Sequence, residues 1–322
     1  MTSSPGIIAV FNAKGGVGKT TTAVNLAVCL AMMGRRVLLV DMDAQGNATT
    51  SFGSSELPGL GTYELITGRC TLAEAMRPTF VDNLWLVGAT DGLNAMDLEL
   101  AGDPPAHGVL RDIVATQGQD LDLVVIDCPP GVGAATVNAL VSAHGVLCPA
   151  NPTPFAHDGL ARTWAMVGRI RAALNPELRV VGVVMSLVDD GVRVWQDDVA
   201  AVIRAEFGAL VFPQPIGHAP DLFGAAAAYG VPAVMFAPIA AEVSAFIDLA
   251  LWLLAREPRL GGEADERPVP PRAVVCAGLQ SSHLRLAKAG YFEQQGNIPA
   301  LPRGAELGIG PVMTPMVRNV AE

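Results

Sequence analysis

The stretch "FNAKGGVGKTTT", residues 11–22, constrains the fold of this chain more than any other. The apolar run "GIIAVF" at 6–11 precedes it, and an alanine- and leucine-rich run at 20–34 follows. These patterns predict a buried strand, a glycine-rich turn and a helix that ends at Gly34. In that arrangement the backbone N–H groups of the turn point at a bound phosphate, and the helix dipole adds positive potential. The segment therefore predicts a phosphate-binding loop.

Lysine use supports the same interpretation, because Lys14 and Lys19 are two of only three lysines in a chain that otherwise uses arginine. A compact ammonium on a flexible stem can follow a phosphate, whereas a planar guanidinium would crowd a tight loop. We expect Lys19 to reach the β- and γ-phosphates and the Thr20 hydroxyl to ligate Mg²⁺. A glycine-rich turn without a ligand is the alternative. The predicted nucleotide-binding residues are Lys14, Gly15, Gly16, Val17, Gly18, Lys19, Thr20 and Thr21.

The rest of the body alternates short β-branched runs with helical segments. This alternation predicts an α/β fold of the P-loop NTPase kind, with a mostly parallel twisted sheet covered by helices on both faces. The further strands are expected at 35–41, 84–89, 121–127, 145–150, 179–186 and 209–216. The further helices are expected at 106–117, 133–143, 157–174, 193–207 and 241–256.

Composition excludes several classes of protein. Hydrophobic residues make up 51% of the chain and charged residues 16%, which is typical of a globular protein. Residues 1–257 carry 14 basic side chains against 25 acidic ones, so binding to nucleic acid would need a local basic patch. Five cysteines without a CxxC pair predict plain reduced thiols and a cytoplasmic location. We find no signal peptide, and no apolar run reaches the roughly 18 residues that span a bilayer.

The composition and the periodicity of the sequence change at Pro258. The segment 258–322 is rich in proline and glycine and has little periodicity apart from "SSHLRLAKAGYF" at 281–292. We therefore expect two parts: a P-loop ATPase domain at 1–257 and a tail at 258–322 that is partly disordered or laid over the body. The periodic stretch is short and weakly patterned, so a packed terminal helix is favoured over a membrane-binding one.

Four blocks of this sequence resemble the ParA/MinD family of ATPases. Ala13 occupies the first glycine position of the ordinary P-loop pattern, but "KGGVGKTTTAVNLA" is similar to the deviant Walker A motif of that family, which carries an extra lysine at its start. The residues of these blocks are most similar to those of the Soj-like branch of ParA partition ATPases. The other blocks are "RVLLVDMDAQGNATTSFG" (36–53), "LDLVVIDCPPGVGAATVNALVSA" (121–143) and "LNPELRVVGVVMSLVDD" (174–190), and the resemblance fades near residue 256.

The resemblance assigns roles to two carboxylates. Asp41 and Asp43 follow a strand expected beside the loop, so one or both can face the phosphates; the family favours Asp43, which orients the attacking water. Asp127 matches the Walker B acid, which holds Mg²⁺ through water. The predicted metal ligands are thus Thr20, Asp43 and Asp127, and the predicted cofactors are ATP and Mg²⁺. A carboxylate that merely caps the next helix is the alternative for both aspartates.

The resemblance also gives Lys14 a catalytic role together with Asp43. In the family the matching lysine enters the partner's site when two ATP-bound subunits close face to face, and neutralises charge that develops in phosphoryl transfer. A solvated surface lysine is the alternative. The chain is thereby expected to be a slow ATPase that forms a homodimer on ATP binding and is stimulated by dimerisation and by a partner.

The family further implies non-specific DNA as a partner, together with a ParB-like or cargo adaptor protein. Arg193 falls where the family places a DNA-contacting arginine, although it could be an exposed loop arginine; Arg162, Arg169, Arg171 and Arg204 lie on neighbouring helices. His218 and Asp221 replace two family arginines, which weakens the patch. The implied function is segregation or positioning of a plasmid, a chromosome origin or a large protein assembly, with association to the nucleoid. The alternatives are a nucleotide-switched scaffold that does not bind DNA and, more remotely, a MinD-like membrane-cycling ATPase; no membrane partner is expected.

Overall fold

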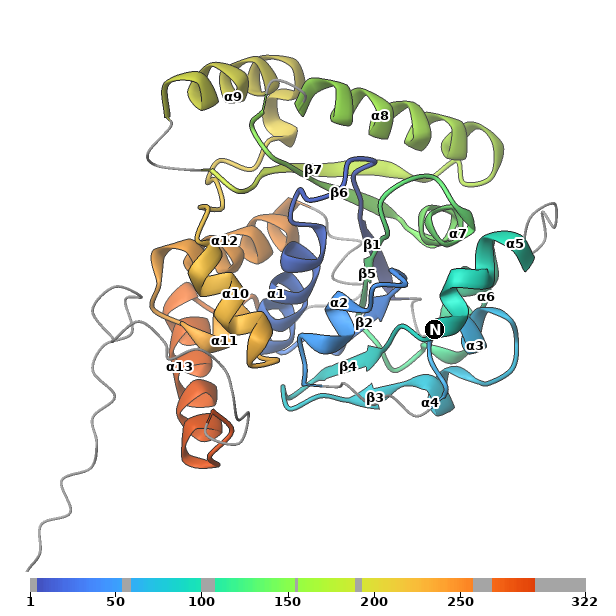
Figure 1. Ribbon diagram of the computed structural model, residues 1–322, viewed down its shortest axis with the longest axis horizontal. Helices are drawn as coiled ribbons and strands as arrows, with labels where there is room; N and C mark the ends of the chain where they lie inside the picture. Colours follow the sequence, from blue (N-terminus) through green and yellow to red (C-terminus); the bar gives the residue numbers. More distant parts are fainter. Residues whose placement is uncertain are drawn as a thin grey trace, which may run out of the picture.

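The computed structural model describes residues 5–53, 59–99, 108–153, 156–188, 193–256 and 268–292. Within these ranges the chain forms a seven-stranded sheet in the order β3-β4-β2-β5-β1-β6-β7 (Figure 1). Neighbouring strands are parallel except β3 with β4. The strands are β1 Gly6–Val10, β2 Val37–Asp41, β3 Arg77–Pro78, β4 Leu84–Val87, β5 Leu123–Asp127, β6 Gly145–Ala150 and β7 Arg179–Met185.

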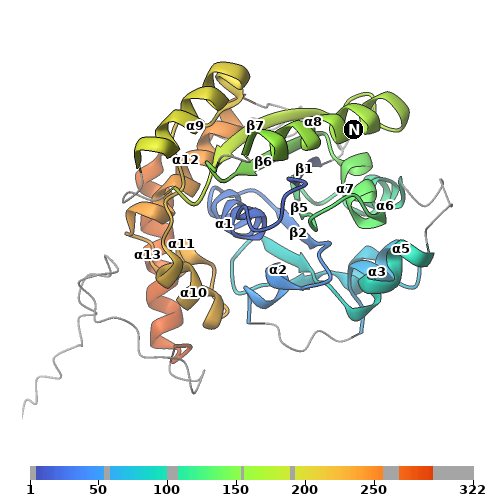
Figure 2. The same ribbon diagram turned by 45° about the horizontal axis from the view of Figure 1, so that its top comes forward.

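Helices cover both faces of the sheet, which is why its central strands are apolar throughout. Ile8 and Val10 of β1 pack with α1 and α10–α13, whereas Ile7, Ala9 and Phe11 pack on the opposite face with helices that include α3 and α6–α8. Figures 1 and 2 show α10–α13 together on one side of the molecule and α3 and α5–α7 on the other. The predicted fold class is confirmed. The helices are α1 Lys19–Met32, α2 Asn47–Thr50, α3 Thr62–Ile66, α4 Leu72–Ala75, α5 Met96–Glu99, α6 Val109–Gln117, α7 Ala134–Ser142, α8 Ala156–Ala173, α9 Arg193–Phe207, α10 Pro220–Ala228, α11 Ala233–Phe236, α12 Ala241–Arg256 and α13 Arg272–Lys288, with 3-10 turns η1 Asp91–Ala95 and η4 Gly208–Leu210.

The predicted strand at 209–216 is wrong. The structure shows the turn η4 and one isolated bridge to β7, between Val211 and Val183, in its place. Pro213 and Pro215 lack the backbone N–H groups that a continuous ladder requires, so the hydrogen bonds to β7 come from residues on either side of the two prolines. Phe212 still donates its N–H to the Val183 carbonyl at 2.8 Å, and the segment follows β7 toward the carboxyl edge of the sheet.

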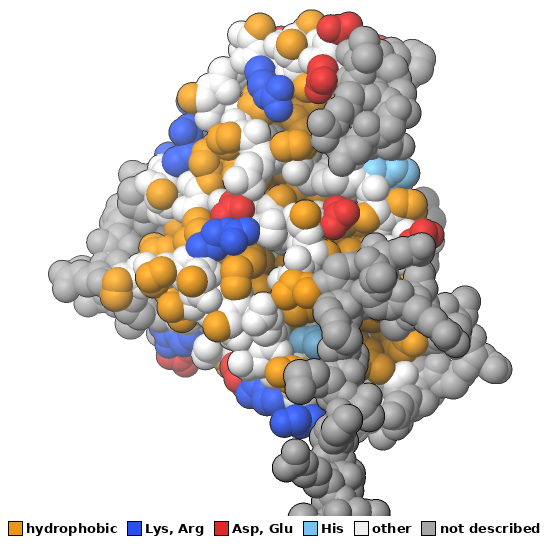
Figure 3. Space-filling view, turned by 90° about the vertical axis from the view of Figure 1, so that its left-hand side faces the viewer, with side chains coloured by type: hydrophobic (Ala, Val, Ile, Leu, Met, Phe, Trp, Pro, Cys, Tyr) orange, Lys and Arg blue, Asp and Glu red, His pale blue; other side chains and the backbone are white. Residues whose placement is uncertain are grey.

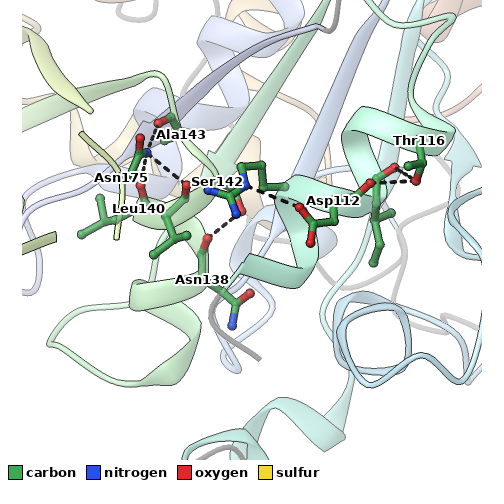
Figure 4. Close-up of polar contacts among 10 residues, drawn as sticks. Asp112, Thr116, Asn138, Leu140, Ser142, Ala143 and Asn175 are labelled. Atoms are coloured by element: carbon green, nitrogen blue, oxygen red, sulfur yellow. Dashed lines mark hydrogen bonds and ion pairs between the residues drawn. The ribbon is translucent and has the colours of Figure 1, made fainter. Parts of the chain in front are cut away.

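One buried amide closes the C-terminal end of α7. The side-chain nitrogen of Asn175 lies 2.7–3.1 Å from the carbonyl oxygens of Leu140, Val141 and Ala143, which have no partner within the helix (Figure 4). Ser142 in the same turn donates its hydroxyl to the Asn138 carbonyl. These bonds fix the point where the chain leaves α7 and enters β6, whose far end borders the loop between β1 and α1.

Residues 268–292 of the predicted tail lie over the body and contain α13, which packs against α1, α11 and α12. A packed helix was expected at 281–292, and most of that stretch is helical. On the side of the molecule where α12 and α13 lie, hydrophobic and charged side chains are mixed at the surface (Figure 3). Residues 257–267 and 293–322 lie outside the described residues, so the domain boundary at 257 stays a prediction.

Among the described residues, no helix is both long enough and apolar enough to cross a membrane. All five cysteines are free thiols, and burial raises the pKa of Cys29 and Cys148. Buried, protonated thiols of this kind pack as small hydrophobic side chains.

Candidate nucleotide-binding site

The turn between β1 and α1 has the backbone of a phosphate-binding loop. Gly16 and Gly18 have φ angles of 69° and 80°, in the left-handed region that glycine adopts most readily. Helix α1 then begins at Lys19, and no side chain caps its first N–H groups. Because those N–H groups need acceptors, an anion in front of the helix would satisfy them.

Lys19 is a buried cation whose side chain folds back onto this loop. Its side chain is 7% exposed, and Nζ donates to the Lys14 carbonyl oxygen at 3.2 Å. Burial lowers the pKa of Lys19, and the nearby Asp127 is the largest influence in the opposite direction. A neutral carbonyl is a weak partner for an ammonium that has lost its water, so phosphate oxygens would bind it more strongly.

Two acids end neighbouring strands at the same level of the sheet. The register of β2 with β5 pairs Asp41 with Asp127, and the register of β1 with β5 pairs Val10 with Asp127. Parallel strands present their carboxyl ends on one edge, and the loop after β1 opens on that edge. The sheet thus brings Asp127, Asp41 and Lys19 together from three separate parts of the sequence.

The structure separates the roles of the two aspartates that follow β2. Asp41 is fully buried: its Oδ2 accepts the backbone N–H and the hydroxyl of Thr49, at 2.8 and 2.7 Å, and its Oδ1 accepts the Asp43 N–H. Burial raises the pKa of Asp41 to about 6. Asp43 is less buried, and its Oδ1 accepts only the Gln45 N–H among the described residues. Asp41 therefore holds the segment after β2 in place, and Asp43 is the carboxylate left to face a ligand.

Asp127 is a buried carboxylate at the end of β5, next to the phosphate-binding loop. It is fully buried, and neither side-chain oxygen makes a hydrogen bond of standard geometry within the described part of the chain. Burial and then the charge of Asp41 raise the pKa of Asp127, while the nearby Thr20 hydroxyl acts in the opposite direction. An unsatisfied carboxylate at this depth is costly unless a cation or water reaches it.

These side chains fit a Mg²⁺ ion that is bound together with phosphates and water, rather than a metal ion held by protein side chains alone. No group of three His, Cys, Asp or Glu side chains among the described residues is arranged to hold a metal ion alone. Mg²⁺ keeps several waters and is commonly bound by one or two carboxylates together with substrate phosphates. The unbonded oxygens of Asp127 supply such a position, and Thr20, Asp43 and Asp127 stay the predicted ligands.

The side chain of Lys14 points away from its own loop. Its Nζ donates to the Thr153 hydroxyl at 3.0 Å, next to the start of α8. The aliphatic part of the Lys14 side chain lies against Gly159 of α8, because a Cβ added to Gly159 would lie 3.5 Å from the Cβ of Lys14. A cavity of about 230 Å³ beside it is lined by Lys14, Asp158, Gly159 and Arg162. Lys14 thus differs from Lys19, which is buried against the loop.

A buried polar pair that sequence reasoning missed shapes the backbone around Lys14. Asn12 accepts the Lys14 N–H at 3.0 Å and donates to the Pro149 carbonyl at 2.8 Å. The Thr163 hydroxyl of α8 accepts the Ala13 N–H at 3.1 Å. Asn12 directly follows an apolar strand, which was a signal in the sequence, but Thr163 lies 150 residues away and carries no local signal.

A second feature missed by sequence reasoning is a cavity beside the phosphate-binding loop. It measures about 200 Å³, and residues that line it include Gly18, Ser186, Leu187, Ile216, His218 and Pro220. The Ser186 hydroxyl donates to the Val17 carbonyl at 2.7 Å, which ties the loop to the end of β7. Leu187 has φ 57°, a strained value for a bulky residue and one that is found mostly at functional sites. A mainly apolar cavity with a few polar edges fits a planar nucleotide base.

The predicted DNA-binding residue, Arg193, is the first residue of α9, and its side chain lies outside the described residues. Arg162, Arg169 and Arg171 are exposed on α8, and Arg204 is exposed on α9. Figures 1 and 2 show α8 and α9 along the same edge of the molecule. Asp158, Asp197 and Asp198 are exposed on the same two helices, so the charge of this surface is mixed.

Known proteins show to which family this chain is similar. A family model described as an AAA domain matches residues 6–180. The chromosome-partitioning ATPase Soj of Thermus thermophilus is 40% identical over 249 residues, which are 77% of this chain and 95% of that protein. The sporulation initiation inhibitor protein Soj of Bacillus subtilis is 32% identical over 249 residues, with 76% and 96% covered.

A similar solved structure is that of a protein described as cobyrinic acid a,c-diamide synthase from Mycobacterium smegmatis, with bound ADP and magnesium. It has a TM-score of 0.67 and 28% sequence identity, and the alignment covers 83% of this chain and 100% of that one.

Proposed function

The chain belongs to the ParA family of partition ATPases, close to its Soj-like members, and from this premise we propose that it positions a cargo by cycling on and off DNA as an ATP-dependent dimer. It is an ATPase of the ParA type, with ATP and Mg²⁺ as cofactors. The observation that carries the proposal is the contrast between two lysines: Lys19 is buried over its own loop, whereas Lys14 is directed outward to Thr153.

In the proposed reaction each residue of the site has a separate task. Lys19 exchanges the Lys14 carbonyl for phosphate oxygens, and the N–H groups at the start of α1 bind the same phosphates. Thr20, Asp43 and Asp127 would hold Mg²⁺, and Asp43 accepts a hydrogen bond from the attacking water and so orients it. Mg²⁺, when bound, neutralises charge on the phosphate oxygens. Lys14 of a second subunit completes that neutralisation.

The cavity lined by Gly18, Ser186 and His218 takes the adenine base in this proposal. Its volume of about 200 Å³ and its place beside the loop suit a base joined to phosphates that lie in front of α1. His218 is thereby part of the nucleotide site, although its position in the sequence matches a family arginine that binds DNA.

We expect Asp43→Ala to trap the dimer. Without the carboxylate that orients the attacking water, hydrolysis stops, while Lys19 and the loop still bind ATP. With ATP and Mg²⁺ the variant should elute and scatter light as a species of twice the monomer mass, and with ADP as a monomer. Asp91→Ala, which removes an exposed carboxylate in η1, is the matched control and should behave as wild type. A monomer under every nucleotide condition would contradict the dimer.

DNA binding rests on the family and on the exposed arginines of α8 and α9. Phosphate contacts of this kind are independent of sequence and weaken steeply with salt. Because acidic side chains lie on the same two helices, we expect weak binding in the monomer that becomes measurable when the dimer doubles the number of contacts. A ParB-like or cargo adaptor protein then stimulates hydrolysis and releases the dimer.

Arg193→Glu should lower the DNA affinity of the ATP-bound Asp43→Ala dimer about tenfold, because a charge reversal replaces one phosphate attraction by a repulsion. Co-sedimentation with DNA at low and high salt measures this. Arg111→Glu, on α6 far from α9 in Figures 1 and 2, makes the same change in net charge and should leave binding unchanged. If the wild-type dimer does not sediment with DNA at low salt, a scaffold recruited by a protein partner is the better function.

A further inference from the structure

The C-terminal segment of the described chain contacts the segment that follows Asp43. After α13 the chain turns at Gly290, and Tyr291 and Phe292 lie on the body. The Tyr291 ring lies 5.6 Å from that of Phe80, which lies 5.7 Å from that of Phe52, one residue beyond Ser51 at the end of α2.

The contact is closest at two glycines. Gly53 and Gly230 have φ angles of 71° and 62°, and a Cβ on Gly230 would lie 2.7 Å from the Cα of Gly53. A Cβ on Gly53 would collide with the hydroxyl of Tyr291, which also lies 3.5 Å from the Gly230 carbonyl. Gly53 is exposed to solvent, but the turn after α10 and the Tyr291 hydroxyl leave no space for a side chain on it.

The corner formed by Tyr291 and Phe292 is itself firmly held. The ring of Phe292 packs against Tyr229 and Phe236 at 5.7 and 6.0 Å, and against His283 of α13 at 5.4 Å. His283 Nδ1 lies 2.8 Å from the Met235 carbonyl of α11. Because aromatic pairs at these distances restrict one another, the Tyr291 ring has a fixed support.

One face of helix α2 borders a cavity. The cavity measures about 240 Å³ and lies between α1, α2 and the α10–α11 segment, and Thr20, Asn47, Thr50, Ser51 and Phe223 are among the residues that line it. Helix α2 is one turn long, so its own hydrogen bonds cannot stabilise it. It is held by Ala48, which is buried in the core, by Thr49, which binds Asp41 and the Ala89 N–H, and by the Phe52–Gly53 segment that contacts Tyr291.

We propose that Tyr291 is a positioning residue for hydrolysis, which acts through Gly53 and α2 to fix Asp41 and, through the Asp41–Asp43 hydrogen bond, Asp43. The inference rests on the proposed role of Asp43. The chain of contacts runs from Tyr291 to Gly53, from α2 by Thr49 to Asp41 Oδ2, and from Asp41 Oδ1 to the N–H of Asp43. A residue that follows α13 thereby sets the geometry of the proposed catalytic carboxylate.

The test compares Tyr291→Ala with Tyr291→Phe in the full chain. Removal of the ring should speed hydrogen exchange of the amides at 49–53 at least ~10-fold in the nucleotide-free protein, because α2 loses the support at its end. It should lower kcat for ATP about fivefold and change KM less than ~2-fold, because Lys19 and the loop are untouched. Tyr291→Phe keeps the ring contact with Phe80 but removes the hydroxyl that lies against Gly53 and the Gly230 carbonyl, so both measurements should change in the same direction as in Tyr291→Ala and by less.

Leu284→Ala, on the exposed side of α13, is the control for a general effect on the helix and should change neither measurement. Exchange of the β5 amides reports whether the core remains folded. The proposal is overturned if Tyr291→Ala leaves both the exchange rate of the α2 amides and kcat for ATP at wild-type values, whether or not the melting temperature falls. If the wild-type chain hydrolyses no ATP, the proposed function fails and the positioning role with it, while α2 exchange still shows whether Tyr291 holds the helix.

Discussion

Replacement of Lys19 by alanine is expected to lower the affinity for ATP at least ~100-fold, because the loop loses its one buried cation and the charged hydrogen bonds to phosphate that it supplies. The fold should persist, since the ammonium is buried at a cost and its only hydrogen bond among the described residues is to the Lys14 carbonyl. Isothermal titration with ATP and Mg²⁺, with far-UV circular dichroism as a check of folding, measures both effects.

The third lysine of the chain provides the matched control. Lys288 is exposed near the end of α13, so Lys288→Ala removes the same group from a place without phosphate contacts and should bind ATP as wild type. Undiminished ATP affinity in Lys19→Ala would show that the loop does not bind the nucleotide in the proposed way, and every later step would lose its basis.

Lys14→Ala is expected to bind ATP within ~3-fold of wild type but to lose at least ~100-fold in the rate of phosphate release. The side chain points to Thr153, away from its own loop, so its loss leaves the local phosphate contacts intact. In the dimer the same group neutralises charge in the partner's site, and a cation brought in from a neighbouring subunit contributes factors of this size or larger in related reactions.

A mixing experiment distinguishes whether Lys14 acts on the nucleotide of the partner subunit or on the nucleotide of its own subunit. Neither Lys14→Ala nor Asp43→Ala should hydrolyse ATP alone, but a mixed dimer has one site with an intact Asp43 and a lysine from the other subunit. An equal mixture should recover about a quarter of wild-type turnover, because half of the dimers are mixed and each has one complete site. If Lys14 serves its own subunit, the mixture stays inactive.

The loop region was predictable because its chemistry is local. The strand at 6–11, the turn and the start of α1 follow from adjacent residues, and left-handed φ angles at Gly16 and Gly18 require glycine at those positions. The ends of the parallel strands were predictable for a similar reason, since apolar runs that end in Asp41 and Asp127 place both acids at one edge of the sheet. The helices 193–207 and 241–256 were also predicted at the bounds observed.

Contacts between distant segments were not predictable in the same way. The run 209–216 reads as a strand because its valine, phenylalanine and isoleucine are typical of one, yet its two prolines prevent a ladder. From the sequence His218 was taken only as a replacement for a family arginine that weakens DNA binding, but it lines the cavity beside Gly18. Nothing local indicated that Thr163 would hold the turn at Ala13, or that Tyr291 would pack on Gly53.

The segments that form the sheet, the phosphate-binding loop and the side chains that carry its charge can be predicted from the sequence, because they depend on backbone conformation and residue chemistry over a few neighbouring positions. The direction of the Lys14 side chain and the contact of Tyr291 with Gly53 depend on the tertiary structure, since Lys14 meets Thr153, 139 positions away, and Tyr291 lies in another part of the chain from Gly53. The same holds for Asp127, whose oxygens make no hydrogen bond of standard geometry with described residues, although Asp41 beside it in the sheet is bound by Thr49. Such distant residues meet in one closely packed interior, where burial removes water and each polar group must find its partner among the groups that the fold brings near.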